Sequence, residues 1–134
     1  MTVEPGPDES ELFHAIVDGS ASHAERLLQR NPALVDGRFL SNASFLHLAG
    51  NKGDLAIVNL LISGGADVNK PSDPPLYCPP LCDAAEKGYV DIVETLLRRG
   101  ALVDGVDCTS VTPLMLAARE ARLDVIEVLL DAGA

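Results

Sequence analysis

The sequence predicts an all-α fold of helix-turn-helix units that stack on one another in a row. Three segments, SFLHLAG, PPLCDAA and TPLMLAA, contain leucines that recur at nearly equal intervals, at Leu46, Leu81 and Leu114. Closing glycines recur at the same two intervals, at Gly65, Gly100 and Gly133. Independent landmarks therefore agree on one period. Each unit pairs two short apolar helices that cannot bury their apolar faces alone, so neighbouring units must cover them.

The last unit shows the pattern most fully. Thr112 is a typical helix cap and Pro113 suits the first position of a helix, which LMLAA continues. The second helix, LDVIEVLL, follows a short turn, and Gly133 closes the unit. In that turn Ala121 replaces the glycine of the earlier units, so we expect a tighter or more helical turn there.

A helix-turn-helix period of about 33 residues with a TPLH-like opening resembles the ankyrin repeat family. The stretch GADVN, at residues 65–69, is similar to the usual exit of an ankyrin unit. The resemblance covers residues 44–134, and residues 11–36 more loosely. It implies a solenoid with projecting β-turn or hairpin fingers. We expect a flexible tail at 1–9 and one domain at 10–134, with a degenerate first repeat; the repeats are 10–42, 43–77, 78–110 and 111–134.

The first unit lacks the TPLH-like opening. Ser10 is the expected cap of a helix ELFHAIVD, and a second helix, ASHAERLLQR, should follow Ser20 and end before Pro32. Apolar residues at helical spacing form its expected buried set, which is Leu12, Phe13, Ile16, Ala24, Leu27 and Leu28. The remaining positions are largely charged, which suits a capping unit whose outer face meets water.

Further caps and apolar stripes define the middle units. Ser44 should cap a helix that begins at Phe45, and Asp54 should cap LAIVNLLIS. His47 occupies the histidine position of the TPLH-like opening, where the family resemblance implies a structural hydrogen bond. In the third unit we expect Ala84, Ala85, Ile92, Val93, Leu96 and Leu97 to point inward.

Composition and charge limit the classes of function. The 134-residue chain carries a formal net charge of -10, which opposes binding to nucleic acid and to anionic membranes and favours a basic or neutral partner. No apolar run approaches the roughly 20 residues that span a bilayer, and the acidic start does not resemble a signal peptide. We therefore expect a cytoplasmic, or nuclear, protein. Three cysteines are too few for a disulfide framework, and we expect reduced thiols.

Nothing in the sequence indicates catalysis, a cofactor or a metal site. The phosphate-binding patterns GxGxxG and GxxxxGK are absent, and each glycine cluster coincides with a repeat boundary. Cys78 and Cys82 lack the CxxC spacing of a zinc site, and no histidine follows them. We therefore interpret the chain as non-enzymatic. A module that binds a protein or peptide is the first hypothesis; the alternative is a dedicated acidic inhibitor, of the immunity-protein type, that blocks a basic enzyme or toxin.

The family resemblance implies that a partner lies on a concave face lined by the first helices and the finger tips. The two residues before each inter-helix turn then point into that face. We expect these to include Asn51, Lys52, Glu86, Lys87, Arg119 and Glu120. The expected finger residues are Asp73, Leu76, Tyr77, Asp107 and Cys108.

The finger KPSDPPLYCPP, at residues 70–80, has two interpretations. Its five prolines either stiffen an irregular turn, or present Leu76 and Tyr77 as anchors that lose little entropy on binding. Asp83 stands where the pattern has leucine, and a carboxylate there must be hydrogen-bonded. It either bonds the proline-rich loop or lines the binding groove.

The last unit does not look like a terminal cap, because its second helix is apolar on most sides. We therefore expect this end to pack on further repeats or on a second copy of the chain.

Overall fold

A computed structural model describes residues 6–37, 44–72, 78–106 and 109–134. The elements in these ranges are eight α-helices and one short 3-10 helix, which confirms the prediction of an all-α repeat fold. The chain divides into two compact units, Met1–Asp67 and Val68–Ala134. Each unit contains two helical hairpins.

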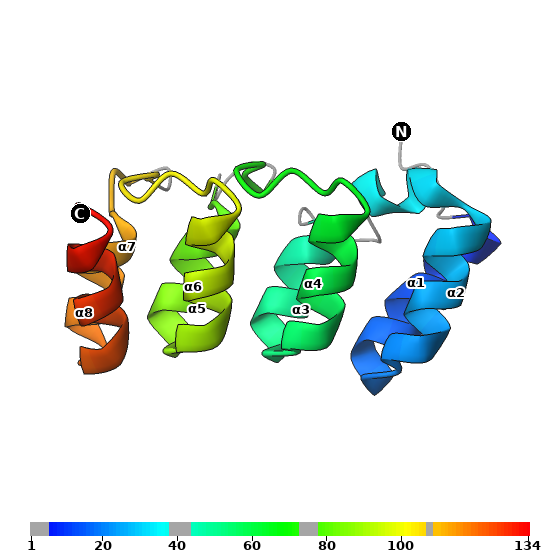
Figure 1. Ribbon diagram of the computed structural model, residues 1–134, viewed down its shortest axis with the longest axis horizontal. Coiled ribbons are helices and arrows are strands. Elements are labelled where there is room, and N and C mark those ends of the chain that lie inside the picture. The colour runs from blue at the N-terminus through cyan, green and yellow to red at the C-terminus, as the bar shows by residue number, and fades with distance from the viewer. Residues whose placement is uncertain (1–5, 38–43, 73–77, 107–108) are drawn as a thin grey trace. The chain divides into compact units, whose positions relative to one another are not determined.

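The first unit holds α1 (Pro7–Asp18), α2 (Ala21–Arg30), the 3-10 helix η1 (Pro32–Asp36), α3 (Phe45–Lys52) and α4 (Leu55–Ser63). Within it α1 packs against α3 and α2 against α4, so like helices of the two hairpins lie side by side (Figure 1). The buried core is largely aliphatic among the described residues, and includes Leu12, Ile16, Leu27, Phe45, Leu46, Ile57, Val58 and Leu61. Phe13 and Leu28, which we expected in the core, are only half-buried.

Helix α1 begins at Pro7, ahead of the expected cap at Ser10, so residues 7–9, which we expected in a flexible tail, are helical. One half of a capping box, the bond from the N-cap amide to the Glu9 side chain, explains the earlier start. The Gly6 amide donates to Glu9 Oε2 at 2.8 Å, and Pro7 fits the first helical position because it has no amide to satisfy. The prediction missed this cap because glycine carries no side-chain acceptor.

The caps of the second hairpin are the expected ones. Ser44 Oγ accepts from the His47 amide at 3.4 Å and lies 2.8 Å from His47 Nδ1, and the imidazole is only 1% exposed. This buried contact gives His47 a structural role. At the next helix, Asp54 Oδ1 accepts from the Ile57 amide at 3.2 Å.

The second unit holds α5 (Pro80–Lys87), α6 (Val90–Arg98), α7 (Pro113–Arg119) and α8 (Leu123–Asp131). Here α5 packs against α7 and α6 against α8 (Figure 1). The buried residues recur at the positions where the two hairpins face each other: Leu81, Ala84, Ala85, Ile92, Val93, Leu96, Leu116, Ala117, Val125 and Leu129. Leu97 is half-buried, not fully inward as expected.

The turn at Ala121 differs from the expected one. Ala121 has a φ of 56°, so it adopts the left-handed conformation that Gly88 adopts at 77°. The hydrogen bonds of the two turns also match: Tyr89 N donates to Ala84 O at 3.1 Å, and Arg122 N donates to Ala117 O at 2.8 Å. The prediction of a tighter turn was wrong. Packing of the two helices fixes the same left-handed conformation at this position, and Ala121 adopts it despite the steric cost.

Asn69 ties the segment that leads into α5 to the turn that follows α6. Its Nδ2 donates to the Gly100 carbonyl at 3.0 Å, and its Oδ1 accepts from the Leu102 amide at 2.8 Å. A side-chain amide has one donor group and one acceptor, so it bonds both backbone groups of that turn at once. This bidentate contact holds the two segments at a fixed separation.

Candidate functional site

The expected binding residues lie in two places. Asn51 and Lys52 are exposed at the end of α3, in the first unit. In the second unit, Glu86 and Lys87 end α5, while Arg119 and Glu120 lie at the end of α7. The expected finger residues fall outside the described residues: Asp73, Leu76, Tyr77, Asp107 and Cys108.

Glu86 and Arg119 come together although they belong to different hairpins. Arg119 Nη2 donates to Glu86 Oε1 at 2.9 Å, and Arg119 Nε lies 3.4 Å from Glu120 Oε1. All three side chains are partly exposed, so the ion pairs contribute little to stability. They do hold the guanidinium between two carboxylates, which compensates its charge.

Beside this ion pair, a cavity of about 190 Å³ opens between α5 and α7. Both hairpins and the loops before them contribute to its lining, which consists of Cys78, Asp83, Glu86, Thr109, Val111, Leu116 and Arg119. We call this space the α5–α7 cavity. The lining residues include two carboxylates, Asp83 and Glu86, and one guanidinium, Arg119, so their formal net charge is negative.

The α5–α7 cavity includes residues that the sequence did not single out. Glu86 and Arg119 were expected, and Asp83 was considered in two roles, but Thr109, Val111 and Leu116 were not. Leu116 belongs to the apolar pattern of its helix, so the sequence indicated only that it lies in the core and not that it also lines a cavity. Thr109 and Val111 precede the Thr112 cap. Their position directly before the first helix of a repeat is the sequence feature from which their place at the cavity could have been predicted.

Asp83 bonds the proline-rich loop, as the first of the two alternatives predicted, and it also lines the α5–α7 cavity. The Cys78 thiol of that loop donates to Asp83 Oδ1 at 3.6 Å. The pKa of Cys78 is raised, chiefly by a hydrogen bond with the Cys82 side chain, and further by burial and by the Asp83 charge. The thiol therefore stays protonated and neutral.

The ends of the proline-rich segment are joined by two hydrogen bonds. The Ser72 amide donates to the Cys78 carbonyl at 2.9 Å, and the Cys78 amide donates to Ser72 Oγ at 2.9 Å. Ser72 is buried, which protects these bonds from water. The described residues on both sides of 73–77 are thus fixed against each other.

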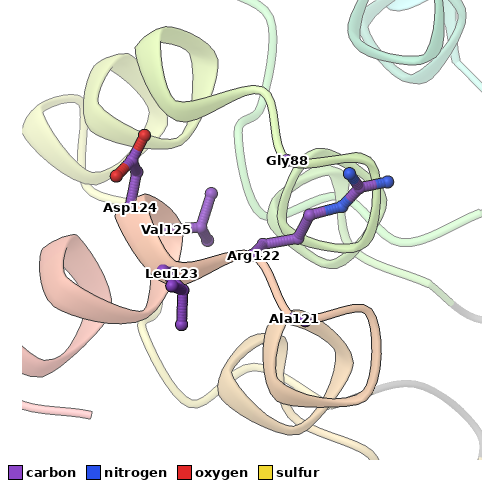
Figure 2. Close-up of a pocket in the computed structure, with 6 residues that line it drawn as sticks. All are labelled: Gly88, Ala121, Arg122, Leu123, Asp124 and Val125. Carbon is purple, nitrogen blue, oxygen red and sulfur yellow. The ribbon is translucent and has the colours of Figure 1, made fainter.

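A larger cavity, of about 380 Å³, lies at the turns of the two hairpins, and Figure 2 shows its lining residues. Arg122 extends past Gly88 there, and its Nε donates to the Glu86 carbonyl at 3.1 Å, while Asp124 points to the other side (Figure 2). Arg122 thus serves as a link between repeats. This leaves the cavity without a cluster of side chains directed at a common point, so we prefer the α5–α7 cavity as the candidate site.

Three observations on the described residues bear on other kinds of site. These residues contain no group of three or more His, Cys, Asp or Glu side chains that could hold a metal ion. Among the helices of the described ranges, none is long and apolar enough to cross a membrane. Within the described ranges, Cys78 and Cys82 are cysteines that form no disulfide.

The stacked helical hairpins, with a left-handed residue in each inter-helix turn and charged residues at the ends of α5 and α7, define a helical repeat protein. A model of the ankyrin repeat family, described as ankyrin repeats in three copies, matches residues 46–134. The chain belongs to the ankyrin repeat family. The hairpin of α1 and α2 lies before the matched region.

The curated relatives are much longer proteins. The chain is 37% identical over 123 residues to a probable E3 ubiquitin-protein ligase, XBOS33, of Oryza sativa subsp. japonica, covering 89% of this chain and 23% of that protein. It is 31% identical over 132 residues to the ankyrin repeat and KH domain-containing protein mask-1 of Caenorhabditis elegans, covering 97% and 5%. The chain therefore spans less than a quarter of the length of either relative.

Proposed function

We propose that this chain is a non-catalytic module that binds a protein or peptide through the ends of its first helices and its finger loops. Ankyrin repeats are in general protein–protein interaction modules. The observation that carries the proposal is the α5–α7 cavity, where the expected residues Glu86 and Arg119 meet beside the half-buried Asp83. The negative charge of the chain favours a basic or neutral partner and disfavours nucleic acid. Such a module would work in the cytoplasm or nucleus.

A capture experiment with matched variants tests this proposal. The tagged wild-type chain is compared with a Tyr77→Ala, Lys87→Ala double variant, which removes an expected finger anchor and an exposed charge at the end of α5. Glu94→Gln is the control, because Glu94 is exposed on α6 and lines a different cavity. We expect the double variant to lose a partner that the wild type and the control both retain. Equal recovery by all three would refute the assignment of the binding surface.

The alternative is a dedicated inhibitor whose acidic surface blocks a basic enzyme or toxin. A net charge of -10 favours it, because opposite charges steer association. Ionic strength separates the two functions. The association rate of an electrostatic inhibitor should fall steeply as salt rises, whereas binding through aromatic and aliphatic anchors should change little.

We also propose that the end of the last repeat packs on further repeats or on a second copy of the chain. Cys82 is fully buried in α5, whereas Met115, at the same position of α7, is 56% exposed. Leu123 and Leu130 of α8 are 72% and 53% exposed. Sedimentation over a range of protein concentrations tests the second copy. A mass that stays monomeric at every concentration would leave only packing on further repeats.

A further inference from the structure

We infer that a groove between α6 and α8 is a second binding surface, which takes a short basic segment of a partner protein with an aliphatic side chain between lysines or arginines. This surface goes beyond the proposed function, because it is formed by the second helices of the hairpins and not by the ends of the first helices.

The groove combines apolar side chains that a ligand can reach with charged ones. It has a volume of about 310 Å³ and is lined by Glu94, Leu97, Arg98, Val128, Asp131 and Ala132. We call it the α6–α8 groove. Leu97 and Val128 are half-buried and Ala132 is exposed, so each keeps apolar surface in contact with water. An aliphatic side chain that covers this surface removes it from water, which favours binding.

The apolar residues of the groove are the chain neighbours of core residues. Leu96 is 1% exposed and Leu129 is fully buried, and both hold their helices in the core of the second unit. Leu97 follows Leu96, and Val128 precedes Leu129, by a rotation of about 100° around the helix. This rotation turns Leu97 and Val128 from the core toward the surface. Because α6 packs against α8, the groove between them has fixed walls.

The charges on these two helices favour a basic ligand. Their exposed charged residues are five carboxylates and one guanidinium, which are Asp91, Glu94, Arg98, Asp124, Glu127 and Asp131. By contrast, α4 has no charged residue, and α2 carries Glu25 together with Arg26 and Arg30. The acidic surface therefore belongs to the helices that form the groove and is not a general property of the second helices. Such a surface attracts lysine and arginine and repels acidic segments.

Two of these carboxylates line the groove itself. Glu94 comes from α6 and Asp131 from α8, and neither takes part in an ion pair within the described part of the chain. Arg98, the basic residue of the lining, donates from Nη2 to Thr95 Oγ1 on its own helix at 3.4 Å. Lysine and arginine cover apolar surface with their stems while the charged end stays in water or at a carboxylate. They therefore suit the positions on either side of the aliphatic residue.

The size of the groove limits the ligand to a short segment. A volume of about 310 Å³ accommodates an aliphatic side chain with parts of its neighbours and is too small for a folded domain. We therefore use a tripeptide as the probe.

The test uses the full chain, isotope-labelled, and follows backbone amide shifts during titration. The probe is lysyl-leucyl-lysine, blocked at both ends so that no terminal charge takes part. Lysyl-seryl-lysine keeps the charges and removes the aliphatic side chain, and glutamyl-leucyl-glutamate keeps that side chain and reverses the charges. We expect the probe to shift the amides of Leu97, Val128 and Ala132, the serine peptide to bind about tenfold more weakly, and the acidic peptide to shift none of them.

The same titrations can overturn the inference. Equal affinity for the leucine and serine peptides would mean that no apolar contact is made. Equal affinity for the basic and acidic peptides would mean that the carboxylates play no part. Shifts that are largest outside α6 and α8 would place the binding elsewhere.

A pair of variants with the same chemical change tests the position of the charge. Glu94→Gln removes a carboxylate of the lining and should weaken lysyl-leucyl-lysine about threefold, a small loss because exposed ion pairs contribute little. Glu127→Gln is the matched control, because Glu127 is exposed at the same position one repeat later and lies outside the lining. It should change the affinity less than Glu94→Gln does. Equal losses would mean that the attraction is diffuse and that the groove does not bind the peptide. The three peptides decide the question on the wild type if a variant does not fold.

Glu94→Gln also separates this surface from the proposed one. It should weaken the tripeptide, yet a partner held at the ends of the first helices should tolerate it. If the tripeptide does not bind in the groove, but the Tyr77→Ala, Lys87→Ala variant still loses its partner, the groove fails and the proposed function stands. If the tripeptide binds in the groove while the double variant captures its partner normally, the groove stands and the proposed surface fails.

Discussion

Ala121 adopts a φ of 56°, and Gly88, one repeat earlier, adopts a φ of 77° in the equivalent turn. The two residues close matching hairpins, yet only glycine enters this left-handed region without a steric cost. The hairpin of α7 and α8 therefore contains a strained turn. The turn at Gly88 carries no such strain.

Replacing Ala121 by glycine should stabilise the chain. Relief of the left-handed strain outweighs the greater entropy of glycine in the unfolded state, so we expect a gain of about 0.5 to 1 kcal/mol. Urea unfolding measures this gain. The reciprocal variant, Gly88→Ala, should destabilise the chain, since a Cβ at residue 88 would lie 2.7 Å from Arg122 Cδ and would add strain at φ 77°. A lower midpoint for Ala121→Gly would contradict this account.

Removing the Asn69 side chain should loosen the two segments that it joins. Asn69→Ala loses the bonds to the Gly100 carbonyl and the Leu102 amide, which are exposed, so we expect a cost of about 1 kcal/mol. Asn69→Asp keeps an acceptor for Leu102 and loses the donor, so its midpoint in urea should fall between those of the wild type and Asn69→Ala. An unchanged midpoint for the alanine variant would show that these bonds add nothing.

Leu96 provides a test of the repeat core. It is 1% exposed, so Leu96→Ala removes buried methyl groups and leaves a cavity, which should cost about 2 to 5 kcal/mol. Leu102→Ala is the control, because Leu102 is 65% exposed and its truncation should change stability by less than about 0.5 kcal/mol. Denaturant unfolding compares the two variants. Equal effects would mean that Leu96 does not lie in the core.

Cys78 should make the stability of the chain fall at alkaline pH. Folding raises the pKa of this thiol above its ordinary value of 9.0, through the Cys82 hydrogen bond first, so the folded state keeps a proton that the unfolded state releases. Stability is then fully present below pH 9 and declines as pH rises above it. The Cys78→Ser variant lacks this titration, and its denaturant midpoint should fall less steeply above pH 9. Parallel curves for the two proteins would disprove the effect.

Much of the fold could be predicted from sequence because the repeats carry their landmarks at a nearly fixed interval. Ser44, Asp54 and Thr112 cap their helices as expected, since each has a side-chain oxygen that accepts a backbone amide. The start of α1 was missed because the Glu9 side chain caps it from inside the helix. The turn at Ala121 was missed because tertiary packing overrode the local preference of alanine.

The candidate site was less predictable than the fold. The approach of Glu86 to Arg119 follows from the period, because both residues stand at the same position of successive units. Contacts of the loops do not follow from it. Cys78 reaches Asp83 through an insertion that interrupts the repeat, and neither Thr109 nor Val111 belongs to a helical pattern. The repeat period predicts which residues lie on helices, but it does not predict the contacts made by irregular loops.

We expect the residues between Ser72 and Cys78 to be exchangeable, because two hydrogen bonds join Ser72 to Cys78. These bonds already join residues 72 and 78 ahead of α5. A foreign peptide grafted between these two residues would therefore cost mainly the entropy of closing a longer loop. This free-energy cost grows by only about 0.6 kcal/mol for each doubling of loop length. Under the proposed function, binding through residues 73–77 could therefore diversify, by natural variation or by design, while the helices keep their sequence.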